Sequence, residues 1–442
     1  NPMKILPSLI GLFLLSTPSF ALDITVGPGA GFDYGTITEA LANASAGDDI
    51  LVATGTYSLA SGETFPLTMK NGVCLTRASA ASTPIIDASG SQKYVFSCRG
   101  LHMGTEVSGF TITGGHARGA GTHSNGGAFY LDNASLMIAD CIIQGNTAVE
   151  SGGGVSCINY SSPTLYQCTI RFNEARGFGG GGVFCDQYSA PTLQNCVISN
   201  NKAGYGGGGV MCYLYNCDAL ITQCTITQNE ASEGGALWCD YDSAPTVTNC
   251  ILWGNSGAQE IYTFFTTPRV SYCDVRGGFY GTANFDADPR FVDVASGDFH
   301  LDANSPCIDA GDPTGGQDPD GTVLDVGAFY FDQNQSGGFQ LSVNPDPIAA
   351  GQFVTFSVAN ATPNRATYLG YSLSGLGSTY VAALQVTLGL NRPTQLAGPT
   401  AADASGQVMW SMSVPQQAAG LSIWLQAAQF GQVSNVLANV IQ

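Results

Sequence analysis

Charged side chains are scarce in this sequence of 442 residues, and positive charge is the scarcest. Only 11% of the residues are charged, and 14 Lys and Arg stand against 33 Asp and Glu, which gives a net charge of −19. A surface so acidic and so poor in lysine argues against nucleic acid and anionic membranes as partners. It also argues against strong binding of a polyanionic polysaccharide, unless calcium bridges the two.

Long apolar runs are missing after the first 21 residues. No later segment reaches 18 uncharged apolar residues, so neither a transmembrane helix nor membrane insertion is expected. The start of the chain differs: a short basic region, the apolar run 5–15 and a small-x-small sequence at 19–21 follow one another. This order predicts a cleaved signal peptide over residues 1–21 and export to the extracellular space or the cell surface.

A fixed repeat fills the middle of the chain. Its unit reads Cys-x-Ile-x-x-Asn-x-Ala, then a glycine run, and the unit cysteines are spaced by 27, 28, 28 and 26 residues. These are Cys141, Cys168, Cys196, Cys224 and, in a weaker copy, Cys250. Such a period indicates stacked repeats. Apolar and polar residues alternate within each unit, and no unit contains a helical period, which excludes leucine-rich, ankyrin and tetratricopeptide repeats and predicts a β-solenoid.

The repeat positions predict what lies inside each coil. Five residues after each unit cysteine stands an asparagine: Asn146, Asn173, Asn201, Asn229 and Asn255. We expect these asparagines at sharp turns, in the left-handed conformation that asparagine tolerates, with hydrogen bonds from coil to coil. A second set of cysteines is Cys157, Cys185, Cys212 and Cys239. Both cysteine sets are expected to form vertical files; free thiols that fill the interior are favoured, and a few disulfides remain open.

Zinc is not expected in the repeats, because residues 126–255 contain no histidine and no Cys-x-x-Cys spacing occurs.

The repeats resemble the right-handed parallel β-helix proteins of the pectin-lyase-like superfamily over roughly residues 90–275. The Asn-x-Ala…Gly-Gly-Gly-Val pattern is also similar to repeats of bacterial surface adhesins and autotransporters. Residues 22–75 have the strand, helix and strand order of the N-terminal cap of such proteins, with Thr36 as the helix N-cap. The resemblance implies an all-β, right-handed parallel β-helix with a helical cap.

The chain after the repeats is expected to form two further parts. Residues 286–331 are rich in Asp-Pro and Asp-Gly and resemble the choice-of-anchor-type closing module of secreted bacterial surface proteins. The β-helix domain is thus expected over 22–331, with coils over about 76–285. A polar linker follows at 332–338, and short alternating strands over 339–442 predict a small β-sandwich, whose role the sequence does not assign.

Catalytic residues are sought among the acidic side chains, because the resemblance to pectin-lyase-like proteins includes glycan-cleaving enzymes. The candidates are Asp186, Asp240 and Asp242; the first two directly follow second-set cysteines, two coils or about 10 Å apart. That separation exceeds the one used by retaining glycosidases and borders the inverting range. The Asp, His and Arg-x-Lys sets of lyases and polygalacturonases are absent from the repeats. Solvated turn carboxylates are the favoured interpretation.

Binding residues are sought among the exposed aromatics and in one irregular loop. Tyr160, Tyr188, Tyr215 and Tyr241 recur near the second-set cysteines and are the candidate ligand-binding residues. They could present a flat platform to sugar rings, although a structural stack at a turn is favoured. His102, His116 and His123 lie in or near the irregular loop 114–127; solvated histidines are favoured over a catalytic role.

A metal site is considered near the end of the β-helix. The acidic residues there are Asp309, Asp312, Asp318, Asp320 and Asp325. Carboxylates on a flexible loop suit calcium, whereas Asp before Gly or Pro also caps turns; turn capping is favoured, so no cofactor is expected, with calcium as the alternative.

The sequence therefore predicts a secreted, surface-associated β-helix protein. Its role is structural or binding, toward a glycan or another cell-surface component. The alternative is a polysaccharide lyase or glycoside hydrolase that acts on an extracellular glycan.

Overall fold

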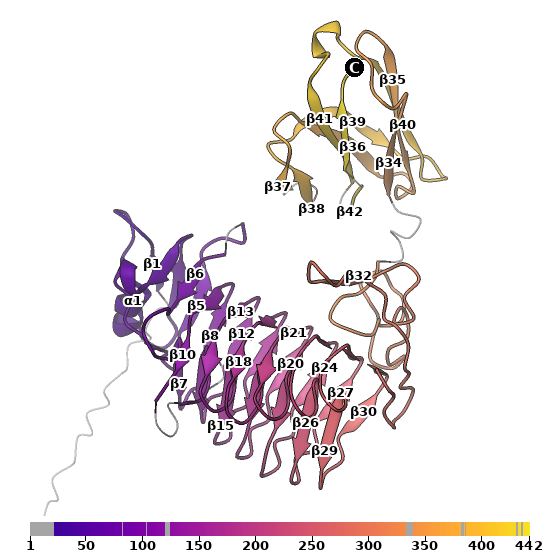
Figure 1. Cartoon of the computed structure of the whole chain (residues 1–442). Helices are drawn as coiled ribbons and strands as arrows, with labels where there is room; N and C mark the ends of the chain where they lie inside the picture. Colours follow the sequence, from indigo (N-terminus) through magenta and orange to yellow (C-terminus); the bar gives the residue numbers. More distant parts are fainter. Residues whose placement is uncertain are drawn as a thin grey trace, which may run out of the picture. The chain divides into compact units, whose positions relative to one another are not determined.

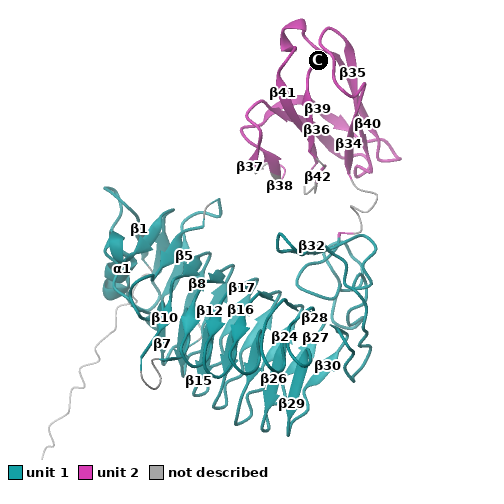
Figure 2. Ribbon diagram, in the orientation of Figure 1, with its two compact units in different colours: residues 1–331 teal, residues 332–442 magenta. Residues whose placement is uncertain are grey.

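The chain forms two compact units, residues 1–331 and 332–442 (Figure 2). The computed structural model describes residues 22–81, 83–102, 104–119, 124–332, 339–381, 384, 386–429, 432–434 and 436–442. The predicted signal peptide, and the predicted linker after residue 332, lie outside the described residues. None of the described helices is long and apolar enough to cross a membrane.

The first unit is a parallel β-solenoid, visible as stacked coils in Figure 1. Sheet A has ten strands: β1 (Asp23–Val26), β2 (Asp49–Val52), β5 (Cys74–Arg77), β8 (Glu106–Ser108), β12 (Met137–Ala139), β16 (Thr164–Tyr166), β20 (Thr192–Gln194), β24 (Leu220–Thr222), β27 (Thr246–Thr248) and β30 (Arg269–Ser271). Sheet B has nine: β3 (Thr56–Ser58), β6 (Ile85–Asp87), β9 (Thr111–Thr113), β13 (Ile142–Gln144), β17 (Thr169–Arg171), β21 (Val197–Ser199), β25 (Thr225–Thr227), β28 (Ile251–Trp253) and β31 (Asp274–Val275).

Two more sheets complete each coil. Sheet C has eight strands: β4 (Leu67–Thr68), β7 (Phe96–Arg99), β11 (Phe129–Asp132), β15 (Val155–Ile158), β19 (Val183–Cys185), β23 (Val210–Cys212), β26 (Leu237–Asp240) and β29 (Ile261–Phe264). Sheet D is shorter: β10 (His116–Ala117), β14 (Thr147–Ala148), β18 (Glu174–Ala175) and β22 (Lys202–Ala203). One full coil therefore runs through β12, β13, β14 and β15, in sheets A, B, D and C.

The interior consists of vertical files of identical residue types, as the period predicts. The second-set cysteines pair in register across sheet C, Cys157 with Cys185, and Cys212 with both Cys185 and Cys239. The unit cysteines are also buried, and their thiols donate to carbonyls of the preceding coil, as Cys196 does to Leu165 O at 3.4 Å. All 14 cysteines are free thiols, which accords with the favoured packing role. The predicted cysteine files are confirmed.

The asparagines form the predicted hydrogen-bonded ladder. Nδ2 of Asn146, Asn173 and Asn201 each donates to Oδ1 of the asparagine one coil on, at 2.9–3.0 Å. The same Oδ1 also accepts the backbone N–H of the preceding rung, as Asn229 Oδ1 does from Asn201 at 2.9 Å. Each rung from Asn146 to Asn229 is at most 1% exposed. The ladder thus satisfies backbone groups at a buried turn, where an unpaired group would be costly.

The predicted left-handed backbone of these asparagines was wrong. Positive φ occurs one residue earlier, at Gly145 (65°), Phe172 (53°), Asn200 (55°), Gln228 (57°) and Gly254 (74°). The residue at the bend faces outward, and the next residue turns inward to join the ladder. The ladder position selects asparagine for its amide, whereas the bend position tolerates several side chains.

The N-terminal end is covered by helix α1 (Ile37–Asn43), which buries Ile37, Ala40 and Leu41 against the solenoid core. Thr36 is the N-cap, as predicted, and its hydroxyl accepts the N–H of Glu39 at 3.1 Å. A second acceptor was not predicted: buried Glu63 accepts the N–H groups of Ile37 and Thr38. A carboxylate suits the positive end of a helix.

Residues 286–331 lie along the side of the solenoid and cover the outer face of sheet B. Their hairpin, β32 (Phe291–Asp293) and β33 (Asp298–Leu301), packs Phe299 against Val197 of β21. Farther along, the N–H of Ala328 donates to Thr225 Oγ1 at 3.0 Å. The outward-facing residues of β21 and β25, and Ile251 of β28, are consequently buried, whereas those of β13 and β17 are half-buried.

The second unit contains antiparallel sheets around its own core, which confirms the predicted all-β fold class. One sheet has β34 (Gln340–Asn344), β35 (Phe353–Ala359) and β40 (Val408–Ser413). Another has β39 (Thr394–Ala401), β36 (Ala366–Ser372), β41 (Ser422–Gln429), β42 (Gln432–Val433) and β43 (Leu437–Val440), and β37 (Leu376–Val381) pairs with β38 (Val386–Leu390). Phe356, Trp410, Leu369 and Leu425 share the core between the first two sheets.

Candidate functional site

The outer face of sheet C carries the predicted acidic candidates in one column. Asp186, Tyr213 and Asp240 each follow a cysteine of the second file, and their strands are neighbours in register. The N–H of Asp186 donates to Cys157 O, and that of Tyr213 to Cys185 O, both at 2.9 Å, so the register continues past the strand ends. Asp186 and Asp240 are therefore two coils apart, about 10 Å along the solenoid, with Tyr213 between them.

The three side chains of this column influence one another. Burial raises the pKa of Tyr213, and the charges of Asp240 and Asp186 raise it further. Burial also raises the pKa of Asp186, while hydrogen bonds from Gln187 lower it. Asp240 is only 4% exposed, and its Oδ1 has no hydrogen-bond partner of ordinary geometry among the described residues. Its pKa is raised by burial, against the N–H of Tyr241 and the Trp238 indole, which lower it.

A groove of about 580 Å³ opens beside this column. Phe184 of β19 and Tyr213, which follows β23, line it. The loop residue Phe178 also lines it, and its ring lies 4.7 Å from that of Tyr213. The remaining polar lining comes from residues of three coils: Ser124, Asn125, Glu150, Ser151, Asp186 and Gln187. We call this site the sheet C groove. It combines aromatic surface, carboxylates and neutral hydrogen-bonding groups, which suits a polar ligand with apolar faces.

The predicted tyrosine column is an exposed stack next to the groove. Ring centroids of Tyr160 and Tyr188 are 5.1 Å apart at 8°, and those of Tyr188 and Tyr215 are 5.8 Å apart at 25°. These rings are 44–64% exposed. Tyr241 extends the column and packs against Phe264 and Phe265. We call these residues the tyrosine ladder.

The tyrosine ladder is a stack at a turn, which was the favoured interpretation, and not the flat platform that was its alternative. Near-parallel rings with centroids only 5.1 Å apart overlap face to face, because coplanar rings side by side would need a wider spacing. The ladder therefore offers ring edges and hydroxyl groups to a ligand. Its backbone is unusual: Tyr160, Tyr188 and Tyr215 have φ of 62–63°, a conformation that is uncommon for large side chains.

The other predicted residues lie outside the groove lining. Asp242 is exposed at a left-handed turn position, φ 62°, beyond the ladder. His102 is exposed, and His123 lies outside the described residues. His116 is in β10 of sheet D; burial lowers the pKa of its imidazole, and the charges of Arg176 and Arg118 lower it further. The structure does not bring His102 or His116 to the column of acids.

Four of the five aspartates of residues 309–325 accept backbone N–H groups of this segment through their carboxylates. Asp312 and Asp320 each accept from the N–H and hydroxyl of a following threonine. Asp325 accepts the N–H groups of Asp309 and Phe331, and Asp318 accepts the N–H of Asp325. No group of three or more His, Cys, Asp or Glu side chains with metal-binding geometry occurs among the residues that the structure describes. Burial raises the pKa of Asp318, and that of Asp325 to about 6.

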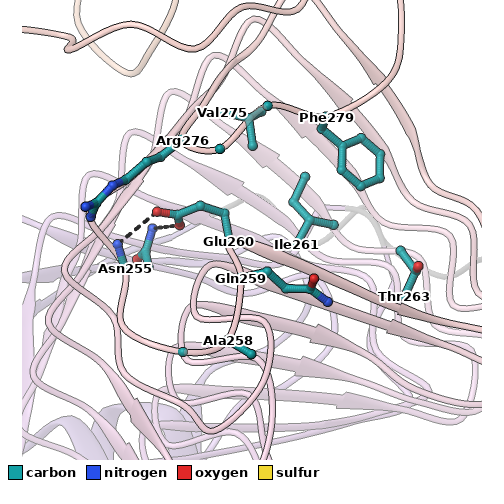
Figure 3. Close-up of a pocket in the computed structure, with 12 residues that line it drawn as sticks. Asn255, Ala258, Gln259, Glu260, Ile261, Thr263, Val275, Arg276 and Phe279 are labelled. Atoms are coloured by element: carbon teal, nitrogen blue, oxygen red, sulfur yellow. Dashed lines mark hydrogen bonds between the residues drawn. The ribbon is translucent and has the colours of Figure 1, made fainter.

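A second cavity, of about 610 Å³, lies where the solenoid stops (Figure 3). The last ladder asparagine, Asn255, has no asparagine after it, and Glu260 takes that role. Its carboxylate accepts Asn255 Nδ2 at 2.7 Å and the Asn255 N–H at 3.2 Å. Burial raises the pKa of Glu260, whereas the Asn255 hydrogen bonds and the charge of Arg276 lower it. The acidic group of this cavity thus serves to end the asparagine ladder.

The sequence reasoning missed most of the groove lining. Tyr213 was detectable, because it follows Cys212 as Asp186 follows Cys185. Phe178 and Glu150 carried no such signal, since both lie in loops that fold over the outside of sheet C. Their position depends on the glycine runs, whose Cα atoms approach the neighbouring coil too closely for a side chain, as at Gly153 with Gly181 O 2.5 Å from an added Cβ.

Comparison with known proteins agrees with this architecture. The family described as "Right handed beta helix region" matches residues 62–219 and 99–286, which together span just over half of the chain. A search of the curated proteins finds no match. The family match and the in-register coils agree over the same residues, so this chain belongs to the right-handed β-helix family.

Proposed function

We propose that this protein is an exported, surface-associated protein that binds a carbohydrate on the outer face of sheet C. The observation that carries the proposal is the sheet C groove beside the tyrosine ladder: aromatic surface, two groove carboxylates and neutral polar groups line one site. Sugar rings have apolar faces and a hydroxyl rim, and such lining matches both. The right-handed β-helix fold is consistent with a carbohydrate-related role, although fold alone does not define function.

Strain in the tyrosine ladder supports a binding role. Asparagine or glycine adopts a left-handed backbone at lower cost than tyrosine. The chain nevertheless has tyrosine at three successive left-handed positions, each at least 44% exposed. Ring stacking offsets part of that cost, by about 0.5–1.5 kcal/mol per pair. Exposed, strained aromatics that contribute little to the core are more easily explained by a ligand.

The proposal is tested by titration of the full chain with a panel of soluble oligosaccharides, using calorimetry. We expect at least one neutral or charged glycan to bind, and the variant Asp186→Asn to weaken that binding about tenfold. The matched control is Glu39→Gln, which removes one negative charge from an exposed residue of α1, far along the chain from the groove. Absence of binding across the panel, or equal binding by both variants, would contradict a glycan site in the groove.

A glycoside hydrolase is the second candidate function. The specific observation in its favour is that Asp186 and Asp240 lie in one column with pKa values raised by burial. A raised pKa suits a general acid, and a separation of two coils, about 10 Å, borders the range for an inverting pair. A lyase is disfavoured, because the described part of the groove lining contains no Lys or Arg. Chromatography of glycans incubated with wild type and Asp240→Asn distinguishes cleavage from binding alone.

Export and surface retention are part of the same proposal. The predicted signal peptide 1–21 and the choice-of-anchor-type resemblance of residues 286–331 support it. Mass spectrometry of the protein from a secreting host is expected to show a mature chain that starts near Leu22. An intact first segment in the secreted or cell-bound protein would contradict export through a cleaved signal peptide.

A further inference from the structure

The charge of the sheet C groove is one-sided. Among the residues that the structure describes, its lining contains the carboxylates of Glu150 and Asp186 and no Lys or Arg. Asp240 adds a third carboxylate on the far side of Tyr213, close enough for both aspartates to raise the pKa of that phenol. No ion pair among the described residues includes any of these three acids.

Other acids of the solenoid do have cationic partners. In the same column, Asp132 pairs with Arg99 at 2.7 Å. On sheet D, Glu174 pairs with Arg176 at 2.9 Å, and Glu230 with Lys202 at 2.6 Å. These three cations are therefore paired with acids that do not line the groove. Glu150 and Asp186 have no ion-pair partner among the described residues, and Asp186 accepts hydrogen bonds from its neighbour Gln187. Burial raises the pKa of Asp186 and that of the adjacent Asp240.

A buried, unpaired carboxylate is unfavourable and is stabilised by a cationic ligand. Oδ1 of Asp240, in a side chain that is 4% exposed, has no ordinary hydrogen-bond partner among the described residues. Asp240 does not line the groove, but its carboxylate adds to the negative charge beside Tyr213. The aromatic lining also favours a cationic ligand, because the ring faces of Phe178, Phe184 and Tyr213 attract cations. An anionic ligand would meet both repulsion and the loss of its own hydration.

We propose that the sheet C groove binds a glycan that carries free amino groups, in which protonated amines contact Asp186 and Glu150 and pyranose faces contact the aromatic residues. This inference rests on the proposed carbohydrate-binding function and narrows it to amino sugars. It places polyuronates, the acidic counterpart, among the ligands that the groove rejects. Charge-assisted hydrogen bonds from the ammonium groups supply the selectivity.

The test uses three oligosaccharides of matched length in weakly acidic buffer: glucosamine, N-acetylglucosamine and galacturonate oligomers. We expect the glucosamine oligomer to bind at least tenfold more tightly than its N-acetylated form, and the galacturonate oligomer not to bind. Added salt is expected to weaken only the glucosamine complex. Asp186→Asn and, separately, Glu150→Gln should each reduce that affinity several-fold, with Glu39→Gln as the control for net charge.

The outcomes separate this inference from the proposed function. Equal affinity for the N-acetylated and free-amine oligomers, with sensitivity to Asp186→Asn, would overturn the amine preference and leave glycan binding intact. Equal binding of a linear polyamine would show that charge alone is recognised and would also overturn it. If none of the three oligosaccharides and no glycan of the wider panel binds, both the amine preference and the proposed glycan binding are contradicted. Glu150 is exposed, so the Glu150→Gln variant remains informative if Asp186→Asn does not fold.

Discussion

Two ladders run along the same coils, one inside the solenoid and one outside. The asparagine ladder is at most 1% exposed from Asn146 to Asn229, and its amides hydrogen-bond to the next coil. The tyrosine ladder is 44–64% exposed from Tyr160 to Tyr215, and its contacts are ring stacking. The first satisfies buried backbone groups that nothing else reaches, whereas the second leaves its hydroxyls to solvent. Repetition alone therefore does not separate the two ladders. Burial and hydrogen bonding identify the asparagine ladder as structural, whereas the exposed tyrosine ladder remains accessible to a ligand.

The largest expected effect concerns a buried group that, unlike the asparagines, is ionisable. Asp274 of β31 is fully buried beside Cys307, and burial raises its pKa to about 7. An unfolded aspartate titrates near ~3.9, so between these values the folded state retains a proton that the unfolded state has lost. The stability contribution of this proton is complete below about pH 4 and is lost as the pH rises to about 7, up to ~4 kcal/mol in total.

Denaturant unfolding of wild type and Asp274→Asn across this pH range tests the effect. The difference between the two curves isolates Asp274 from the other carboxylates, such as Asp325 with a pKa of about 6. The free energy of unfolding of the variant should increase relative to that of the wild type as the pH rises toward neutrality. Parallel curves at all pH values would show that Asp274 is not held protonated.

The substitution Asn201→Ala is expected to interrupt the asparagine ladder inside the solenoid. The change removes an acceptor for the N–H of Asn173 and a donor to Ile170 O, both buried. We expect a loss of about 3 kcal/mol in the free energy of unfolding, because two buried backbone groups lose their partners. The control is Asn43→Ala, an exposed asparagine in α1 whose loss should cost little. Equal melting temperatures for both variants would show that the ladder contributes nothing.

Much of the inside ladder was predictable from the sequence. Period, cysteine files and asparagine rungs follow from residue spacing, because in-register parallel strands place equivalent residues one above another. The backbone conformation was harder to predict from the sequence. Left-handed geometry belongs to the residue before each rung, where Phe172 and Gln228 give no compositional hint.

The outside face was predictable only in part. The tyrosine column and the column of Asp186 and Asp240 follow the same register as the interior. The groove beside them depends on Phe178 and Glu150, whose loops fold over sheet C through contacts distant in sequence. Likewise, the sequence suggested closing residues at 286–331, yet their packing along sheet B depends on outward side chains such as Val197 and Ile251, which read as ordinary strand residues.

The substitution Tyr188→Gly is expected to interrupt the tyrosine ladder on the outside of the solenoid. Glycine relieves the left-handed strain at φ 62° but loses two ring contacts and gains freedom in the unfolded chain. These terms oppose one another, and we expect stability to change by less than about 1 kcal/mol. Glycan affinity should fall several-fold, which calorimetry measures on the same samples. A large loss of stability with unchanged binding would make this ladder structural, like the inner one.

The smallest expected effect concerns calcium at residues 309–325. The carboxylates of Asp312, Asp318 and Asp325 already accept backbone N–H groups, so calcium must displace hydrogen bonds that hold the turns. We therefore expect the free energy of unfolding in millimolar calcium and in chelator to differ by less than about 0.5 kcal/mol. A ligand stabilises the folded state by more than this only when its concentration is well above its Kd. The comparison variant is Asp320→Ala, which removes a carboxylate that caps a threonine. A calcium-dependent rise in melting temperature that disappears in Asp320→Ala would establish calcium as a ligand of this segment. The stability of the outer segment, and not only that of the solenoid interior, would then depend on the calcium concentration.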